Sequence, residues 1–154
     1  MTKHREVKRS EAIDRVHELV KEGGCGAIQE VVGSLARWFP QYSWVGIYVV
    51  HEGMLVLGPW TGAQATEHTR IPIGQGICGA AARSGKTEIV EDVRKDPRYL
   101  SCFVSTRSEI VVPILLDGVV VGEIDIDSEM LDAFTEEDRL FLEKIAELVA
   151  PFIV

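Results

Sequence analysis

Apolar residues recur at helical spacing near both ends of the chain. Residues 10–22 carry one apolar stripe, which ends at Gly23, and residues 27–39 carry a second, which ends at Pro40. Near the C-terminus, residues 135–138 fit a capping box and precede a further apolar stripe. The pattern therefore predicts two helices at the N-terminal end and one at the C-terminal end.

Between these helices the apolar residues form short runs or alternate with polar residues, which is typical of strands. The predicted strands are residues 44–50, 54–57, 87–90, 108–116 and 119–127. A short segment at 70–73 leads through a Gly-rich turn into a brief helix at 77–83, and residues 61–69 and 91–107 read as loops. Helices at the ends around mostly hairpin-linked strands indicate one α+β domain over residues 1–154, with an antiparallel sheet.

Composition narrows the class of protein. A chain of 154 residues with 46% hydrophobic residues can bury a core without a disulfide or metal staple. Three cysteines are too few and odd in number for a secreted disulfide framework, so we expect free thiols in a reducing cytoplasm. A net charge of −8 without a basic patch argues against nucleic acid, and no apolar run is long enough for a membrane span.

Three acids interrupt the last predicted strand at alternate positions. Glu123, Asp125 and Asp127 share one strand face because successive side chains of a strand point to opposite sides. A half-exposed strand would place them in water. The neighbouring run 110–116 is apolar on both faces, however, so the sheet is expected to be covered and its acids neutralised, paired or bound to a ligand. We expect a ligand role for Asp125 and Asp127, and a solvated Glu123 near the hairpin turn.

A glycine-rich motif spans residues 74–79 and matches the spacing G-x-G-x-x-G. A dinucleotide site would require a parallel βαβ unit around this loop. Here the following helix is short and the later strands form a hairpin, so the motif favours a tight turn. Cys78 would then lie in the first turn of a helix, where the helix dipole favours a thiolate; the alternative is a cysteine that is simply packed.

Further candidate residues are a second cysteine and two aromatic side chains. Cys102 lies in an irregular segment between Arg98 and Arg107, and a positive neighbour would favour its thiolate. Trp44 and Tyr48 lie on the same face of one strand, either as core residues or as the aromatic wall of a pocket. Cys25 between two glycines is read as incidental, and no histidine has zinc-ligand spacing to a cysteine, so neither a metal nor a cofactor is expected.

These segments together resemble a GAF domain, specifically the free methionine-(R)-sulfoxide reductase family. The resembling segments are residues 44–48, 55–59, 70–79, 89–93, 108–113 and 125–128. The resemblance implies a GAF-like central antiparallel sheet flanked by N- and C-terminal helices. It also implies reduction of free methionine-(R)-sulfoxide to methionine, with thioredoxin or another thiol as reductant, and it is compatible with a homodimer.

The resemblance also implies residue roles. The nucleophile of the family falls on Cys102, which would become a sulfenic acid and then a disulfide. The carboxylates of the pocket fall on Glu109, Asp125 and Asp127, which would bind the substrate and donate a proton. The aromatic contact to the substrate methyl group falls on Trp44, with Tyr48 beside it.

The chain departs from the family pattern at one position. The family usually places a resolving cysteine two residues before the Arg-Ile-Pro segment, where this chain has His68. Cys78 matches the remaining family cysteine. The alternatives are therefore resolution by Cys78, resolution by an external thiol, or a non-catalytic GAF module that binds a small molecule or senses oxidants through Cys78 and Cys102.

The implied pocket makes a geometric demand on the last hairpin. In a regular hairpin with a two-residue turn at Asp117-Gly118, Glu109 would face Ile126 and point away from the two aspartates. Bringing the three acids to one face needs a longer loop or a bulge. We predict such an irregularity near Pro113.

Overall fold

The computed structural model describes residues 2–100 and 103–153, and its strands form one sheet. The strands are β1 (Trp44–His51), β2 (Met54–Gly62), β3 (Arg70–Pro72), β4 (Glu88–Val90), β5 (Ser108–Leu116) and β6 (Val119–Ser128). They are ordered β3-β2-β1-β6-β5-β4. Every pair of neighbours is antiparallel.

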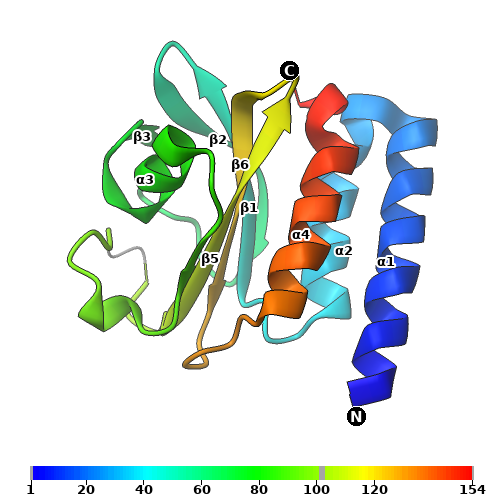
Figure 1. Cartoon of the computed structure of the whole chain (residues 1–154), viewed down its shortest axis with the longest axis horizontal. Helices are drawn as coiled ribbons and strands as arrows, with labels where there is room; N and C mark the ends of the chain where they lie inside the picture. Colours follow the sequence, from blue (N-terminus) through cyan, green and yellow to red (C-terminus); the bar gives the residue numbers. More distant parts are fainter. Residues whose placement is uncertain (1, 101–102, 154) are drawn as a thin grey trace.

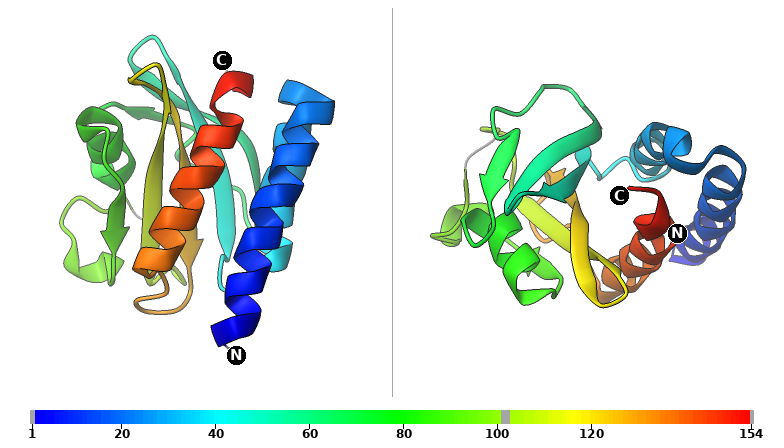
Figure 2. Two further views of the ribbon diagram at one scale, coloured as in Figure 1. Left: turned by 45° about the vertical axis from the view of Figure 1, so that its right-hand side comes forward. Right: turned by 90° about the horizontal axis from the view of Figure 1, so that it is seen from above.

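Helices cover both faces of this sheet. The helices are α1 (Thr2–Gly23), α2 (Ile28–Trp38), α3 (Gly76–Ser84) and α4 (Glu136–Val149), with short 3-10 turns at Gly24–Ala27, Val93–Lys95 and Ala150–Phe152. Helices α1, α2 and α4 lie on one side and α3 lies on the other (Figure 1 and Figure 2). The predicted α+β architecture with terminal helices is confirmed. No helix in the described part of the chain combines the length and apolar character needed to cross a bilayer.

Two elements are longer than the sequence indicated. Helix α1 begins at Thr2 rather than near residue 10, because the charged residues before position 10 are good helix formers and include no proline or glycine. Strand β2 continues past Leu57 to Gly62. Its pairing with β1 shifts by one residue between Gly46 and Tyr48, and this irregularity accommodates Pro59, which cannot donate to a regular ladder.

The β5–β6 hairpin contains the predicted irregularity. Its turn is the two residues Asp117 and Gly118, both with positive φ (52° and 79°), as the tight type I′ turn requires. The register shifts next to Ile114, which pairs with Gly122 while the following Leu115 pairs with Val120. Val121 is therefore an extra residue on β6. This bulge, adjacent to Pro113, places Glu109 opposite Asp127.

The alternating side chains of the sheet supply two cores. The side covered by α1, α2 and α4 buries alternate residues of β1, β5 and β6, namely Val45, Ile47, Ile110, Val112, Ile124 and Ile126. The opposite side buries Trp44, Tyr48 and Val111 against α3 and its flanking loops. The sheet is thus covered on both faces where the acids of β6 lie, as expected from the apolar partner strand.

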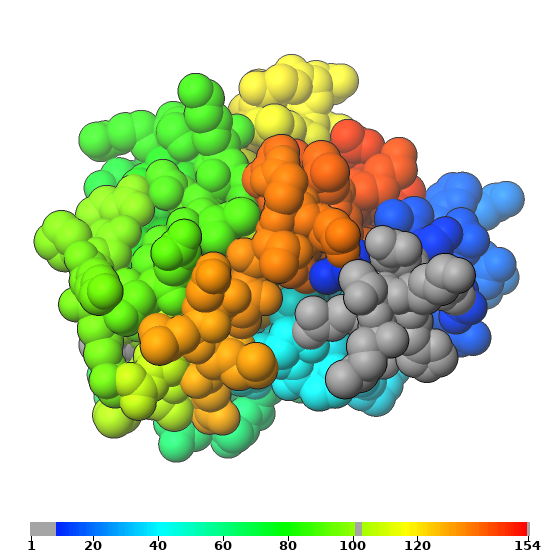
Figure 3. Space-filling view, turned by 60° about the horizontal axis from the view of Figure 1, so that its bottom comes forward, coloured from blue at the N-terminus to red at the C-terminus, as the bar shows by residue number. Residues whose placement is uncertain are grey.

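A buried ion pair ties α1 to the start of α4. Asp138 accepts hydrogen bonds from Arg9 (2.9 Å), from the Tyr42 hydroxyl (2.6 Å) and from the Thr135 backbone (2.8 Å). Thr135 and Asp138 also form the predicted capping box. Burial alone raises the pKa of Asp138, but these hydrogen bonds outweigh it and hold the pKa below its usual range. In the space-filling view, the orange residues of this region lie between green residues on the left and cyan and blue residues on the right (Figure 3).

Candidate functional site

Strand β6 carries a row of three buried carboxyl groups on the α3 side of the sheet. Glu123, Asp125 and Asp127 are 0%, 4% and 2% exposed. The expectation that Glu123 is solvated is wrong: β1 and β5 flank it on both sides, where it pairs with Tyr48 and Pro113. The signal that could have revealed this was its phase, since Glu123 alternates in step with the two aspartates. Its place in the alternation with Ile124 and Ile126 was a better guide to its burial than its closeness to the hairpin turn.

Glu109 joins the row from the neighbouring strand. It is 5% exposed and lies opposite Asp127. Burial raises the pKa of Glu109 well above its usual range, and the charges of the neighbouring Asp125 and Asp127 raise it further. Burial and Asp125 likewise raise the pKa of Asp127. The geometry therefore favours a cluster that shares protons instead of one that is fully ionised.

Cationic side chains do not compensate these acids within the described residues. None of the ion pairs found there includes Glu109, Glu123, Asp125 or Asp127. The Thr106 hydroxyl donates to Asp127 at 3.4 Å. One oxygen of Asp125, one of Asp127 and both of Glu123 have no ordinary hydrogen-bond partner in residues 2–100 and 103–153. Buried polar atoms without partners are costly and indicate a ligand or a shared proton.

Cys78 faces the carboxyl cluster from the first turn of α3. Its sulfur and one oxygen each of Glu109 and Asp125 all lie within 4.8 Å of one another. Burial raises the pKa of Cys78, and the charges of Asp125 and Glu123 raise it further. Of the two interpretations of Cys78, burial therefore favours the packed thiol over the thiolate, because desolvation and the nearby carboxylates oppose the negative charge.

The glycine-rich segment is a tight turn, as the sequence favoured. Gly74 and Gly76 have positive φ of 97° and 69°. A side chain at Gly79 would place its Cβ 2.8 Å from the Gly74 nitrogen and the Pro72 oxygen. These glycines serve backbone geometry and close packing. A dinucleotide-binding unit does not fit, since all strand pairs of the described sheet are antiparallel.

Aromatic side chains border the carboxyl row on the β1 side. The Trp44 ring lies across two glycines, because a Cβ atom added at Gly46 or at Gly62 would lie 2.3 Å from it. Trp60 stacks on Trp44 with ring centroids 6.1 Å apart, and Phe103 packs at 6.0 Å. The sequence interpretation missed Trp60 and Phe103, which come from loops or strand ends with no periodic pattern. Tyr48 is buried, and its hydroxyl donates to the His68 carbonyl at 2.7 Å.

Replacing Gly46 with alanine is expected to displace the Trp44 ring. Overpacking of this kind costs about 1–3 kcal/mol, so the free energy of unfolding should fall and the near-ultraviolet circular dichroism of tryptophan should change. Gly26→Ala is the matched control, because no atom lies within 4 Å of a Cβ at that position. An unchanged spectrum and unfolding curve for Gly46→Ala would contradict the packing of Trp44 described above.

Two small hollows open along the carboxyl row. One of about 90 Å³ has Trp44, Phe103, Thr106 and Asp127 in its lining. Another of about 20 Å³ is lined by Tyr48, Ile71, Ile77, Cys78, Leu100, Glu109 and Asp125. Both therefore place a carboxyl group beside an aromatic ring.

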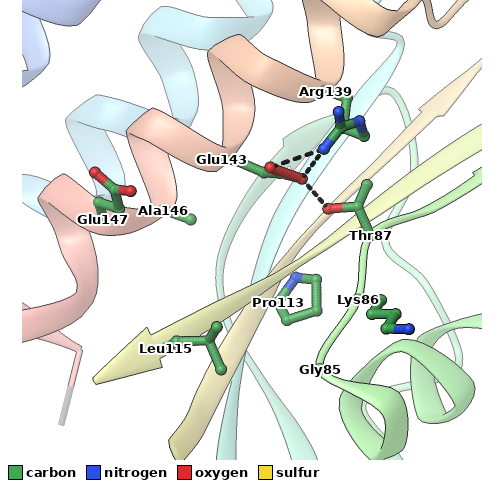
Figure 4. Close-up of a pocket in the computed structure, with 9 residues that line it drawn as sticks. All are labelled: Gly85, Lys86, Thr87, Pro113, Leu115, Arg139, Glu143, Ala146 and Glu147. Carbon is green, nitrogen blue, oxygen red and sulfur yellow. Dashed lines mark hydrogen bonds and ion pairs between the residues drawn. The ribbon is translucent and has the colours of Figure 1, made fainter. Parts of the chain in front are cut away.

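A larger groove of about 520 Å³ lies elsewhere, between α4 and the β4–β5 edge. Within it, Glu143 accepts hydrogen bonds from Arg139 at 3.0 Å and from the Thr87 hydroxyl at 2.8 Å (Figure 4). The groove lacks the buried, unpartnered groups of the carboxyl row. We therefore place the candidate site at the carboxyl row.

The remaining cysteines are Cys102 and Cys25. Cys102 lies outside the described residues. Its expected positive neighbour Arg98 is engaged by Glu88 at 3.2 Å and by Asp96 at 2.8 Å. Cys25 is an exposed free thiol in the turn between α1 and α2.

Comparison with known proteins supplies the family. The GAF domain family matches residues 26–152. The free methionine-R-sulfoxide reductase of Saccharomyces cerevisiae is 44% identical over 111 residues, which cover 70% of this chain and 61% of that protein. Protein YtsP of Bacillus subtilis is 44% identical over 110 residues, covering 70% of this chain and 66% of that protein. The chain thus spans less than two thirds of the length of these two relatives.

Solved structures agree with the sequence relatives. The free methionine-R-sulfoxide reductase from Neisseria meningitidis, in complex with its substrate, superposes with a TM-score of 0.87 at 35% identity, covering 94% of this chain and 87% of that one. By sequence and by its six-stranded antiparallel sheet, the chain belongs to the GAF domain family, with free methionine-R-sulfoxide reductases among its relatives.

Proposed function

We propose that this protein reduces free methionine-(R)-sulfoxide to methionine with thiols as the source of electrons. The observation that carries the proposal is the convergence of Glu109, Asp125 and Asp127 beside Trp44. A buried anionic row next to an aromatic ring suits an amino acid with a cationic ammonium group and a thioether-like side chain. Relatives and structural neighbours named for this activity support the proposal.

Substrate binding follows from the charges of the row. The substrate ammonium would supply the positive charge that these carboxyl groups lack among the described residues. It would bind them through charge-assisted hydrogen bonds, which are stronger than hydrogen bonds between neutral groups. Trp44 and Tyr48 would pack against the methyl and methylene groups of the side chain. Thr106, which donates to Asp127 at 3.4 Å, orients that carboxylate.

In the chemical step, Cys102 is the nucleophile. Its thiolate attacks the sulfoxide sulfur while a protonated carboxyl group of the row donates its proton to the sulfoxide oxygen, which gives an adduct with a bond between the two sulfurs. The hydroxyl group then moves from the substrate sulfur to the Cys102 sulfur as the bond between the sulfurs breaks, and methionine leaves. The sulfoxide oxygen ends on Cys102 as a sulfenic acid, so the substrate is reduced and the cysteine oxidised. A second thiol then condenses with the sulfenic acid, releasing water and forming a disulfide. Thioredoxin or another dithiol reduces this disulfide by exchange.

Recycling is the step in which this chain differs from the family pattern, through His68. The sulfenic acid would be resolved by Cys78, by an external thiol, or not at all. Burial of the Cys78 thiol and its raised pKa make it a slow nucleophile. We therefore expect resolution to limit turnover.

His68→Cys is expected to raise turnover with thioredoxin severalfold, because it supplies an additional thiol close to Tyr48. The contact to Tyr48 uses the backbone carbonyl of residue 68, so the substitution preserves it. Methionine formed in the first turnover, measured without reductant, should remain one equivalent per protein. Equal steady-state rates for the variant and the parent chain would show that resolution is not limiting.

Oxidation of NADPH through thioredoxin reductase and thioredoxin tests the proposal, with free methionine sulfoxide as substrate. The N-acetylated substrate is the control, because it lacks the ammonium group. Loss of one charged hydrogen bond costs about 2–3 kcal/mol, which corresponds to about a 30- to 150-fold lower kcat/KM. Equal use of both substrates would contradict the role given to the carboxyl row.

The second candidate is a non-catalytic GAF module that binds a small molecule or senses oxidants through Cys78 and Cys102. The neutral, buried Cys78 thiol favours it, since such a thiol is poorly suited to rapid turnover. A binding module would retain ligand affinity and show no dependence of any reaction on Cys102.

A further inference from the structure

Four ligand-type side chains gather at the floor of the carboxyl row from three different elements. Cys78 comes from α3, Glu109 from β5, and Asp125 and Glu123 from β6. The Cys78 sulfur and one oxygen each of Glu109 and Asp125 lie within 4.8 Å of one another. Glu123 adjoins Cys78 closely enough to raise its pKa, and the charge of Asp125 in turn raises the pKa of Glu123. Reduction of the sulfoxide gives Glu123 no task.

Carboxylate oxygens without hydrogen-bond partners indicate that these side chains can bind a cation. Glu123 is 0% exposed, and neither of its oxygens has an ordinary hydrogen-bond partner within residues 2–100 and 103–153. Oδ1 of Asp125 is also without one. Buried carboxylates are normally paired with a positive charge or coordinate a metal. No ion pair in the same described residues reaches these acids.

We propose that Cys78, Glu109 and Asp125 bind a thiophilic divalent cation such as Zn²⁺, with the buried, unpartnered carboxyl group of Glu123 next to Cys78 as a supporting negative charge. One thiolate with carboxylate oxygens suits Zn²⁺ or Cd²⁺, whereas a thiolate ligand disfavours Mg²⁺ and Ca²⁺. Ligand atoms less than 4.8 Å apart are compatible with coordination bonds of about 2.0–2.3 Å around one ion. The adjoining hollow of about 20 Å³ has room for an ion or a water molecule, but not for an amino acid.

Binding of the ion involves no redox change. The Cys78 thiol loses its proton to solvent as the sulfur–metal bond forms, and any protonated carboxyl ligand does the same. The inference stands on these four side chains and does not require the reductase activity. Where both hold, the ion and the substrate ammonium compete, because they share Glu109 and Asp125.

Cadmium titration of the reduced protein tests the inference through the ultraviolet absorption of a sulfur–cadmium bond. The protein is the Cys25→Ser, Cys102→Ser double variant, so that Cys78 is the sole thiol. We expect one equivalent of Cd²⁺ to produce the band, with release of protons to a pH indicator. Zn²⁺ should displace the cadmium and remove the band.

Three further variants, made in that double variant, identify the ligands. Adding Cys78→Ser should abolish the band. Glu123→Gln should weaken Cd²⁺ binding about tenfold or more, as loss of a supporting group does at metal sites, and Glu129→Gln should leave it unchanged because that side chain is exposed. Circular dichroism identifies any variant that fails to fold, and for such a variant Asp125→Asn provides the same test.

Absence of the band with Cys78 present would overturn the inference. So would equal affinities of the Glu123→Gln and Glu129→Gln proteins. Either result is independent of whether the parent chain reduces methionine sulfoxide, so failure of this inference and failure of the proposed function can be told apart.

Discussion

Cys102→Ser is expected to lower the rate of methionine sulfoxide reduction by at least about a thousandfold, because a serine hydroxyl cannot replace the thiolate nucleophile. Ligand affinity should stay within about threefold of the parent chain, since the carboxyl row and Trp44 remain. The measurement is methionine formation by the parent and variant proteins, together with calorimetric titration of each with methionine sulfoxide.

Cys25→Ser provides the control for this substitution. Cys25 is exposed and lies in the turn between α1 and α2, away from the carboxyl row. Its replacement should leave both the rate and the affinity unchanged. A Cys102→Ser protein that reduces the substrate at the parent rate would remove Cys102 from the mechanism. Affinity without activity in both proteins would favour the binding module.

Asp138→Asn is expected to destabilise the fold by about 3 kcal/mol, because breaking one partner of a buried ion pair leaves the other uncompensated. Arg9 would lose its buried partner at 2.9 Å, and Tyr42 and Thr135 would lose a charged acceptor. Helix α1 and the start of α4 depend on this contact. Urea unfolding at pH 7, followed by far-ultraviolet circular dichroism, measures the loss.

The same aspartate makes part of the stability dependent on acid. Because hydrogen bonds hold the pKa of folded Asp138 below its usual range, its contribution is present above the unfolded pKa of about 3.9. The contribution is lost as the pH falls through the folded pKa. The difference between the parent chain and Asp138→Asn should therefore shrink in strong acid.

Glu137→Gln is the matched control for Asp138→Asn. Glu137 bonds the same Arg9 at 2.9 Å, but its side chain is 54% exposed, so its removal should cost less than about 1 kcal/mol. Equal losses for the two variants, or a loss at Asp138 that does not diminish in acid, would contradict the buried network.

Local patterns predicted most of the fold. Apolar periodicity located α2 and the long β5–β6 hairpin to within one or two residues, because each has one face buried in a continuous core. The bulge beside Pro113 was predicted by a constraint of another kind: the implied pocket required Glu109 on the same face as Asp127. Strand periodicity alone would have placed Glu109 on the wrong side.

Long-range contacts account for what the sequence could not reveal. Arg9 and Asp138 are 129 positions apart, and no local pattern links them. Likewise, spacing along the chain argued against a metal site, whereas the packing of α3 on the sheet brings Cys78 close to Glu109 and Asp125. The burial of Glu123 depends on strands on both sides of β6. Proximity to a turn was therefore a poor guide to its exposure.

Of the aromatic part of the site, the sequence predicted the strand face but not the packing around it. Trp44 and Tyr48 were recognisable as a same-face pair, and both are buried on the α3 side. The two glycines beneath the Trp44 ring come from β1 and β2, and only the register between those strands brings them together. The pKa of the Cys78 thiol likewise depends more on its burial and on the nearby carboxyl groups than on its place in the first turn of a helix.

The most direct measurement of the proposed activity is the loss of each epimer from racemic free methionine sulfoxide, with dithiothreitol as reductant and chiral separation of the products. We predict that the R epimer disappears with matching formation of methionine, while the S epimer remains. Persistence of both epimers, with the protein folded and its thiols reduced, would contradict the reductase and favour the binding module.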